Sequence, residues 1–236
     1  GNYDFSNMYA YVSSGYVNKV LEGLENSGEV SGSDGDKNTP DDFGDCGTIT
    51  VPAELAGAIE YSAHVRDLGW MDTKRNGQMT GTTGKNLPME GMKINITGIA
   101  DLGIEYQVHA QDIGWMDSVS NGEVGGTVGQ AKKLEAIKLK LTGNAASNYD
   151  LYYRVHVTNV GWMDWAKNGE LAGTQGYNYA LQAVQIALLP KGAVAPGGIE
   201  TPYQINTVKI GYSTHVQDIG WQDEVLGSKI AGTTGQ

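Results

Sequence analysis

Tyr61-Ser-Ala-His-Val-Arg-Asp-Leu-Gly-Trp-Met-Asp72 is the stretch that decides the fold, because the chain contains four versions of it. The shared pattern is Tyr-x-x-His-x-x-x-x-Gly-Trp-x-Asp, found at residues 61–72, 106–117, 153–164 and 212–223. All four histidines of the chain occupy its fourth position: His64, His109, His156 and His215. Internal repetition at such spacing predicts a tandem-repeat architecture.

The residues around each tyrosine alternate between apolar and polar. Ile59, Tyr61 and Ala63 fall on one face of an extended chain, whereas Glu60 and Ser62 fall on the other, which predicts a half-buried strand with the tyrosine ring inward and the histidine toward solvent or a turn. A second strand with one apolar face follows in the first three copies. Its apolar positions are Met92, Ile94 and Ile96, then Ile137, Leu139 and Leu141, then Val184, Ile186 and Leu188.

Glycine-threonine turns separate the two strands of each repeat. They are Gly81-Thr82, Gly126-Thr127, Gly173-Thr174 and Gly232-Thr233. The repeat cores therefore run over about 57–98, 102–143, 149–190 and 208–236, within a repeat domain of residues 47–236. An insertion rich in proline and glycine, from Pro190 to Ile205, lengthens the third interval and is a candidate boundary or exposed functional loop.

Residues 1–46 do not share the repeat. Apolar residues at helical spacing between Val17 and Leu24 predict a short amphipathic helix, and residues 27–45 read as an acidic, glycine-rich linker. The linker contains a weak calcium candidate made of Asp34, Asp36, Asn38 and Asp45. Thr39 replaces the glycine that a calcium loop requires, so an acidic linker is favoured, and neither a metal nor any other cofactor is predicted.

A short apolar segment at residues 48–51 precedes the second strand of the first copy by the length of one repeat. Ile49 and Val51 therefore correspond in phase to Ile94 and Ile96. This phase predicts that residues 48–51 form a second strand that pairs with the last unit and closes the assembly, although an open stack is the alternative. The expected fold is thus all-β, with four tandem repeats forming a β-prism-like or otherwise closed domain.

Composition excludes several classes of partner. The formal net charge is −11, from 27 acidic and 16 basic residues, so a nucleic acid would approach against a repelling field. No apolar run reaches the length of about 18 residues that a membrane span needs. The single cysteine, Cys46, excludes an intrachain disulfide framework.

The Gly-Trp-x-Asp loops and their glycine-threonine turns resemble the clostridial hydrophobic repeat with a conserved tryptophan, the ChW repeat, over roughly residues 47–236. The third copy is closest, because Trp162 and Trp165 match the family's paired tryptophans. The other copies depart from the family with Thr73, Ser118 and Glu224 at the second tryptophan position. The resemblance implies an accessory module of secreted or cell-surface proteins, with suspected binding to carbohydrate or protein.

Tryptophan is the side chain most suited to a binding surface, since its flat face stacks on sugar rings, although it also serves packing between repeats. We expect Trp165 to contact a ligand, because the repeat symmetry does not demand it, with Asp164 and Asn168 beside it. For the tryptophans shared by all copies, packing is favoured and ligand contact is kept as the alternative: Trp70, Trp115, Trp162 and Trp221.

Each histidine is a copy of the others, whereas an active site joins unlike groups in one place. We therefore expect each to fix its loop by a hydrogen bond, with the aspartate of Trp-x-Asp as a candidate partner, rather than to bind a metal or transfer protons. No catalytic residue is predicted. The sequence favours a non-catalytic, secreted or cell-surface module that binds polysaccharide or a surface protein; the alternative is a self-assembling structural subunit of an appendage, sheath or particle.

Overall fold

A computed structural model describes residues 49–207, 211–226 and 231–232. This part of the chain is all-β, as predicted, and its helical elements are two short 3-10 helices, η1 (Ala53–Leu55) and η2 (Asn144–Asn148). The predicted helix and linker of residues 1–46 lie outside the described residues, as do Cys46 and the calcium candidate.

Each of the first three repeats contributes one set of strands. The first repeat has β1 (Ile59–Val65), β2 (Gly69–Trp70), β3 (Lys74–Arg75), β4 (Met79–Gly81) and β5 (Met89–Ile96). The second has β6 (Gly103–Ala110), β7 (Gly114–Trp115), β8 (Val119–Ser120), β9 (Gly125–Gly126) and β10 (Leu134–Thr142). The third has β11 (Tyr149–Val157), β12 (Gly161–Trp162), β13 (Ala166–Lys167), β14 (Leu171–Gln175) and β15 (Leu181–Pro190).

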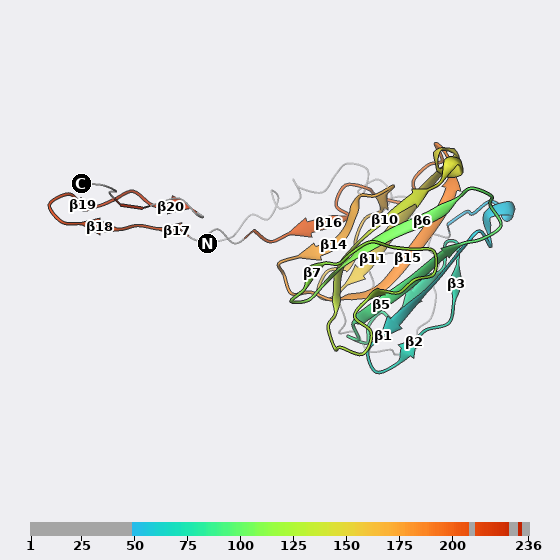
Figure 1. The fold of residues 1–236 in the computed structure, drawn as a ribbon, viewed down its shortest axis with the longest axis horizontal. Helices are drawn as coiled ribbons and strands as arrows, with labels where there is room; N and C mark the ends of the chain where they lie inside the picture. The colour runs from blue at the N-terminus through green and yellow to red at the C-terminus, as the bar shows by residue number, and fades with distance from the viewer. Residues whose placement is uncertain (1–48, 208–210, 227–230, 233–236) are drawn as a thin grey trace, which may run out of the picture. The chain divides into compact units, whose positions relative to one another are not determined.

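The two long strands of each repeat form an antiparallel pair: β1 with β5, β6 with β10 and β11 with β15 (Figure 1). The repeated tyrosines stand opposite core residues of the second strand, with Tyr61 facing Ile94 and Tyr106 facing Leu139. Their rings are buried, and the apolar positions predicted for both strands line the hydrophobic core. The period-two pattern therefore identified the strands and their inward faces correctly.

In the first three repeats, the short strand at the glycine-threonine turn pairs with a different repeat from its own. Strand β9 of the second repeat joins β5 of the first, β14 of the third joins β10 of the second, and β4 of the first joins β15 of the third. We call these three the exchanged strands. Each of the three larger sheets consequently contains strands from two repeats, so the repeats are interlocked rather than simply stacked.

The hydroxyl groups of the three repeated tyrosines, Tyr61, Tyr106 and Tyr153, connect the same pairs of repeats. The Tyr106 hydroxyl accepts a hydrogen bond from the backbone N–H of Ile94 in β5 at 3.2 Å and donates one to the carbonyl of Glu123, just ahead of β9. Equivalent bonds run from Leu139 N–H to Tyr153 at 3.1 Å and from Ile186 N–H to Tyr61 at 3.3 Å. Burial raises the pKa of all three tyrosines, so their hydroxyls stay protonated and keep donating.

A glycine is required where each exchanged strand crosses its host strand. Gly126 has a φ of +130°, and a Cβ added to it would lie 2.4 Å from the carbonyl oxygen of Glu90. Gly81 and Gly173 meet the carbonyls of Gln182 and Glu135 in the same way. A side chain here would clash with backbone, which explains why glycine precedes threonine in these turns.

Two fold predictions are corrected by the structure. Residues 49–52 form no strand, and Ile49 and Val51 instead pack beside Gly77, so the expected pairing of an N-terminal strand with the last unit is wrong. The sheets also stay separate, and none of those in the described residues closes on itself. The prediction failed because sequence phase reports the position of an apolar residue within a repeat but not its hydrogen-bonding partner.

The fourth copy differs from the other three. Its strands are β17 (Gly211–Tyr212), β18 (His215–Val216), β19 (Gly220–Trp221) and β20 (Val225–Leu226), preceded by β16 (Tyr203–Ile205) in the connection from the third repeat. Strand β17 pairs with β20 and β18 with β19, each as a two-stranded sheet. The tyrosine-histidine segment is therefore extended here too, but it is split into two short strands.

We predict that Tyr106→Phe lowers the free energy of unfolding by about 1–3 kcal/mol, because it strips the Ile94 N–H and the Glu123 carbonyl of a partner. Urea unfolding measures the loss. Tyr177→Phe is the control, because Tyr177 is a half-buried side chain on the loop after β14, and it should change stability little. Equal stability of Tyr106→Phe and the unmodified protein would contradict a bridging role for the hydroxyl.

Candidate functional site

A tight hairpin places each Gly-Trp pair at the end of the histidine strand. In the first repeat, His64 stands opposite Trp70 and Val65 opposite Gly69, and the turn is closed by a hydrogen bond from Leu68 N–H to the Val65 carbonyl at 3.1 Å. Asp67 has a φ of +65°, a conformation that aspartate and asparagine tolerate better than most residues. The same positive φ recurs at Asp112, Asn159 and Asp218, so the four hairpins share one turn geometry.

The ends of these hairpins expose apolar side chains, and we call each aliphatic-Gly-Trp unit a tip. Four aliphatic residues are exposed at the equivalent position: Leu68, Ile113, Val160 and Ile219. Trp70 is 38% exposed and Trp221 is 73% exposed, while Trp115 and Trp162 are partly buried. The repeated tryptophans therefore lie at the surface and do not form the interior of the sheets.

The histidines hold these tryptophan rings edge-to-face. The ring centroids lie 5.4 Å apart for His64 and Trp70, and 5.3 to 5.5 Å apart in the other three copies. The sequence placed the histidines toward solvent or a turn; His109 and His156 are buried and lie beside the hairpin turn, opposite Trp115 and Trp162. The tryptophan covers the imidazole, and the imidazole in turn fixes the plane of the indole.

A β-bulge in each second strand of the first three repeats places a polar side chain near the histidine Nδ1, and in the third repeat the two are hydrogen-bonded. The bulged residue is Glu90 in the first repeat, Glu135 in the second and Gln182 in the third. His156 Nδ1 lies 3.0 Å from the Gln182 side-chain oxygen, and His109 Nδ1 lies 3.3 Å from a Glu135 carboxylate oxygen. The aspartate of Trp-x-Asp, the candidate partner from the sequence, is not the group that this nitrogen faces.

Glu135 shows how the site balances burial and charge. Burial raises the pKa of its carboxyl group, while the neighbouring His109 and Lys133 lower it, and the net direction is upward. Glu90 is also buried, but it carries an additional partner, because Arg66 Nε donates to its carboxylate at 2.7 Å. The three histidine partners thus differ in charge although their place in the fold is the same.

Cationic side chains cover some of the tryptophan rings. Lys93 Nζ lies 4.4 Å from the centroid of Trp70. The Arg154 guanidinium lies 4.6 Å from the ring of Trp162 and 4.9 Å from that of Trp165, so it contacts both indoles of the third repeat. A cation over an indole is attracted by the ring quadrupole, which further fixes the orientation of the ring.

The structure overturns the expectation that Trp165 is the leading ligand contact. Its side chain is only 2% exposed and belongs to a second hydrophobic cluster with Tyr152, Ala187 and Leu189. Ala193, in the insertion, packs against this cluster. Symmetry does not demand Trp165, as the sequence indicated, but its extra ring serves to hold the insertion that only the third repeat carries.

Asp164 and Asn168 also have structural partners. Asp164 accepts hydrogen bonds from the backbone N–H and the hydroxyl of Thr201, both at 2.9 Å, and so fixes the far part of the insertion. The Asn168 side-chain oxygen accepts from the Leu151 N–H, and its amide donates to Asp150. The three residues grouped by sequence therefore organise the insertion and the start of β11, while the exposed tryptophans lie elsewhere.

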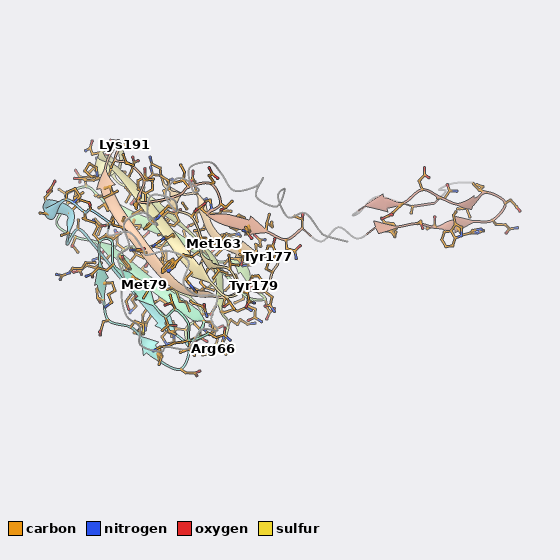
Figure 2. The ribbon with its side chains drawn as sticks, turned by 180° about the vertical axis from the view of Figure 1, so that it is seen from behind. Arg66, Met79, Met163, Tyr177, Tyr179 and Lys191 are labelled. Atoms are coloured by element: carbon orange, nitrogen blue, oxygen red, sulfur yellow. The ribbon has the colours of Figure 1, made fainter. Side chains whose placement is uncertain are left out.

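Asp150 is the buried anchor of the insertion. Its carboxylate accepts from Lys191 Nζ and the Gly192 N–H, both at 2.8 Å, and lies 3.0 Å from Lys167 Nζ. Figure 2 shows Lys191 at the end of β15, where the insertion begins. Burial alone raises the pKa of this carboxyl group, but the hydrogen bonds from these donors outweigh it and hold the pKa well below its usual range.

Sequence analysis missed the aliphatic residue of each tip and the glutamate or glutamine of each bulge. The tip residue had a usable signal, because an aliphatic side chain precedes Gly-Trp in all four copies without belonging to either alternating strand. The described residues contain no cluster of three or more histidine, cysteine, aspartate or glutamate side chains that could hold a metal ion. None of the described helices is long and apolar enough to cross a membrane.

The tip lies within every stretch that a family comparison recognises. The family model for Clostridial hydrophobic W repeats, ChW, matches residues 64–98, 109–143, 156–190 and 215–236, which together make up more than half of the chain. The chain belongs to the ChW family. ChW repeats are typical of secreted and surface proteins. No curated protein and no solved structure matches this ChW chain.

We predict that Trp165→Ala lowers the free energy of unfolding by about 3–5 kcal/mol, the usual cost of deleting a buried aromatic side chain. Limited proteolysis should then cut residues 191–200, which lose the surface they pack on. Trp70→Ala is the matched control, and its partly exposed ring should cost distinctly less. A protease-resistant insertion in Trp165→Ala would contradict the structural role assigned to this side chain.

We predict that Asp150→Asn destabilises the protein by about 2 kcal/mol at pH 7, because it removes a buried charge from two lysines that are partly exposed. The folded pKa lies below the unfolded value, so the carboxylate stabilises the fold above pH of about 4 and loses this effect as the pH falls further. Unfolding curves of both proteins should therefore converge below that pH. Asp72→Asn, at an exposed carboxylate, is the control and should change stability little at pH 7.

Proposed function

We propose that this chain is a non-catalytic binding module of a secreted or cell-surface protein, and that its tips recognise a polysaccharide. The observation that carries the proposal is the repeated exposure of an aliphatic residue and a tryptophan on a hairpin whose indole is held edge-on by histidine. Exposing apolar surface does not help folding, so a feature repeated at every tip calls for another explanation. Contact with a ligand supplies one.

The chemistry of a tip suits a sugar ring. The exposed part of the Trp70 ring offers an apolar surface to the C–H face of a pyranose, and the exposed side chain of Leu68 adds to it. His64 and Lys93 hold the ring, so little side-chain freedom is lost when a ligand binds. The chain's net charge of −11 favours neutral glycans over strongly anionic ones.

Repetition would compensate for weak individual contacts. A polysaccharide presents the same unit many times, so several tips on one chain can engage neighbouring units of one polymer. The second and later contacts then form at high effective concentration. This arrangement needs no reacting group, which agrees with the proposal that the module is not an enzyme.

We predict that Trp70→Ala weakens glycan binding about three- to tenfold, corresponding to roughly 0.7–1.4 kcal/mol for one stacked ring. Replacing Trp70, Trp115 and Trp162 together by alanine should reduce binding by much more than any single change. The measurement is retention on a panel of neutral polysaccharides, followed by titration with tryptophan fluorescence. Val194→Ala is the control, because Val194 is exposed on the insertion and belongs to no tip.

Two results would count against polysaccharide recognition. If the triple variant keeps full affinity for a bound glycan, the tips of the first three repeats are not the binding surface. If the unmodified protein ignores every glycan and forms ordered polymers by itself, a structural subunit of a surface assembly becomes the better reading. Light scattering of the protein without glycan decides the second case.

A further inference from the structure

The exchanged strands of the second and third repeats differ at their outer edge. Strand β14 is followed outward by β16, which runs parallel to it with Gly173 opposite Tyr203 and Gln175 opposite Ile205. Strand β9 is the last strand of its sheet among the described residues. The outer edge of β14 is thus covered by an extended segment, whereas no strand in the described part of the chain covers the equivalent edge of β9.

The pairing of β16 depends mainly on the backbone. Gly173 N–H donates to the Pro202 carbonyl at 2.9 Å, and Asn206 N–H donates to the Gln175 carbonyl at 2.8 Å. One side-chain bond is added, from the Tyr203 hydroxyl to the Gln175 side-chain oxygen at 2.6 Å. Since main-chain bonds dominate, the same ladder can form wherever another exchanged strand offers the same backbone pattern.

Strand β9 offers that pattern. Gly126 and Thr127 occupy the places of Gly173 and Thr174, and Val128 takes the place of Gln175. Thr127 N–H points inward and donates to the Glu90 carbonyl at 2.7 Å. Successive N–H groups of a strand point to opposite sides, so the Gly126 N–H faces the outer edge, as Gly173 N–H does in β14.

The surroundings of β9 are apolar and exposed. Val124 is 42% exposed and Val128 is 38% exposed, on either side of the glycine pair, and Gly126 itself is partly exposed. In β14 the residue equivalent to Val124 is Leu171, which is only partly exposed. Gly81, at the same position of the remaining exchanged strand β4, is buried. The edge of β9 is therefore the more accessible of the two that no described strand covers.

We propose that the outer edge of β9 is a docking site for an extended segment of a second polypeptide, which adds a parallel strand in the register that β16 adopts on β14. The occupant is a linker like residues 202–206, the connection that leads into a ChW repeat. Val128 replaces the hydrogen-bonding Gln175, so an aromatic or aliphatic side chain packs there. This site lies on the sheet edge, apart from the tips, and it binds protein rather than glycan.

The test uses the full chain and a synthetic peptide of residues 199–207, Ile-Glu-Thr-Pro-Tyr-Gln-Ile-Asn-Thr. Titration followed by amide and methyl NMR should shift the Gly126 amide and the Val128 methyl groups in a saturable way. The Gly173 amide should not move, because its own linker already covers it. Saturable shifts at Gly173 alone, or no shift at Gly126, would overturn the proposal.

Two modified peptides separate strand addition from other contacts. N-methylation at Asn206 removes a donor of the ladder and should abolish binding, whereas N-methylation at Ile205 alters an N–H that points away from the ladder and should be tolerated. Val128→Lys should weaken binding at least tenfold, because a charge on an edge strand opposes pairing. Equal binding of both methylated peptides would contradict strand addition at the edge of β9. The triple tip variant should bind the peptide normally, so a failure of glycan recognition would leave this test intact.

Discussion

The hydrogen bonds of three buried tyrosine hydroxyls hold the interlocked repeats together. Each hydroxyl receives the N–H of a strand in another repeat and donates to a carbonyl just ahead of the exchanged strand of its own repeat. The exchanged strand is short, only two residues in β9, and could not hold its position by pairing alone. The exchanged strand is held in place because the tyrosine ring is buried and its hydroxyl bonds one backbone N–H and one backbone carbonyl. The strands then approach so closely that only glycine fits where they cross.

The tips depend on this framework indirectly. The bulge that brings Glu90, Glu135 or Gln182 to the histidine is also where the exchanged strand crosses, since its carbonyl accepts from the arriving threonine in the first and third repeats. Packing between repeats thus fixes the position of the histidine, and the histidine fixes the orientation of the tryptophan ring. The tips of the first three repeats are therefore positioned from the core of the molecule, although they look like separate loops.

Strand periodicity allowed the inward faces to be predicted, because burial acts on each side chain according to its parity along the chain. Tyr61 and Ile94 were placed correctly for that reason. The exchange of strands was not predicted, because the sequence around Gly81 and Gly126 does not indicate which repeat these strands pair with. The prediction for Ile49 was wrong for the same reason. Its position in the repeat matched that of a second strand, but its side chain packs near Gly77 and its backbone joins no sheet.

The sequence singled out Trp165 as the leading ligand contact, but the structure buries Trp165 and exposes Trp70. Trp165 stood out by breaking the repeat, yet the residue and the insertion beside it are both unique to the third copy and explain each other. The exposure of Trp70 could not be predicted from the sequence, because it depends on the direction in which the hairpin leaves the sheet. The insertion is also the segment whose final residues lie beside β14, so one departure from symmetry accounts for both Trp165 and β16.

The strand exchange also constrains how a gene encoding such repeats can change. A repeat deleted from the first three would take away both the strand it donates and the host strand that receives another, leaving two neighbours with unmet backbone groups. Unequal recombination by one unit within this set is therefore expected to be purged. A unit added beyond it, such as the fourth copy, disturbs no existing pairing, so arrays of this kind should lengthen from their ends.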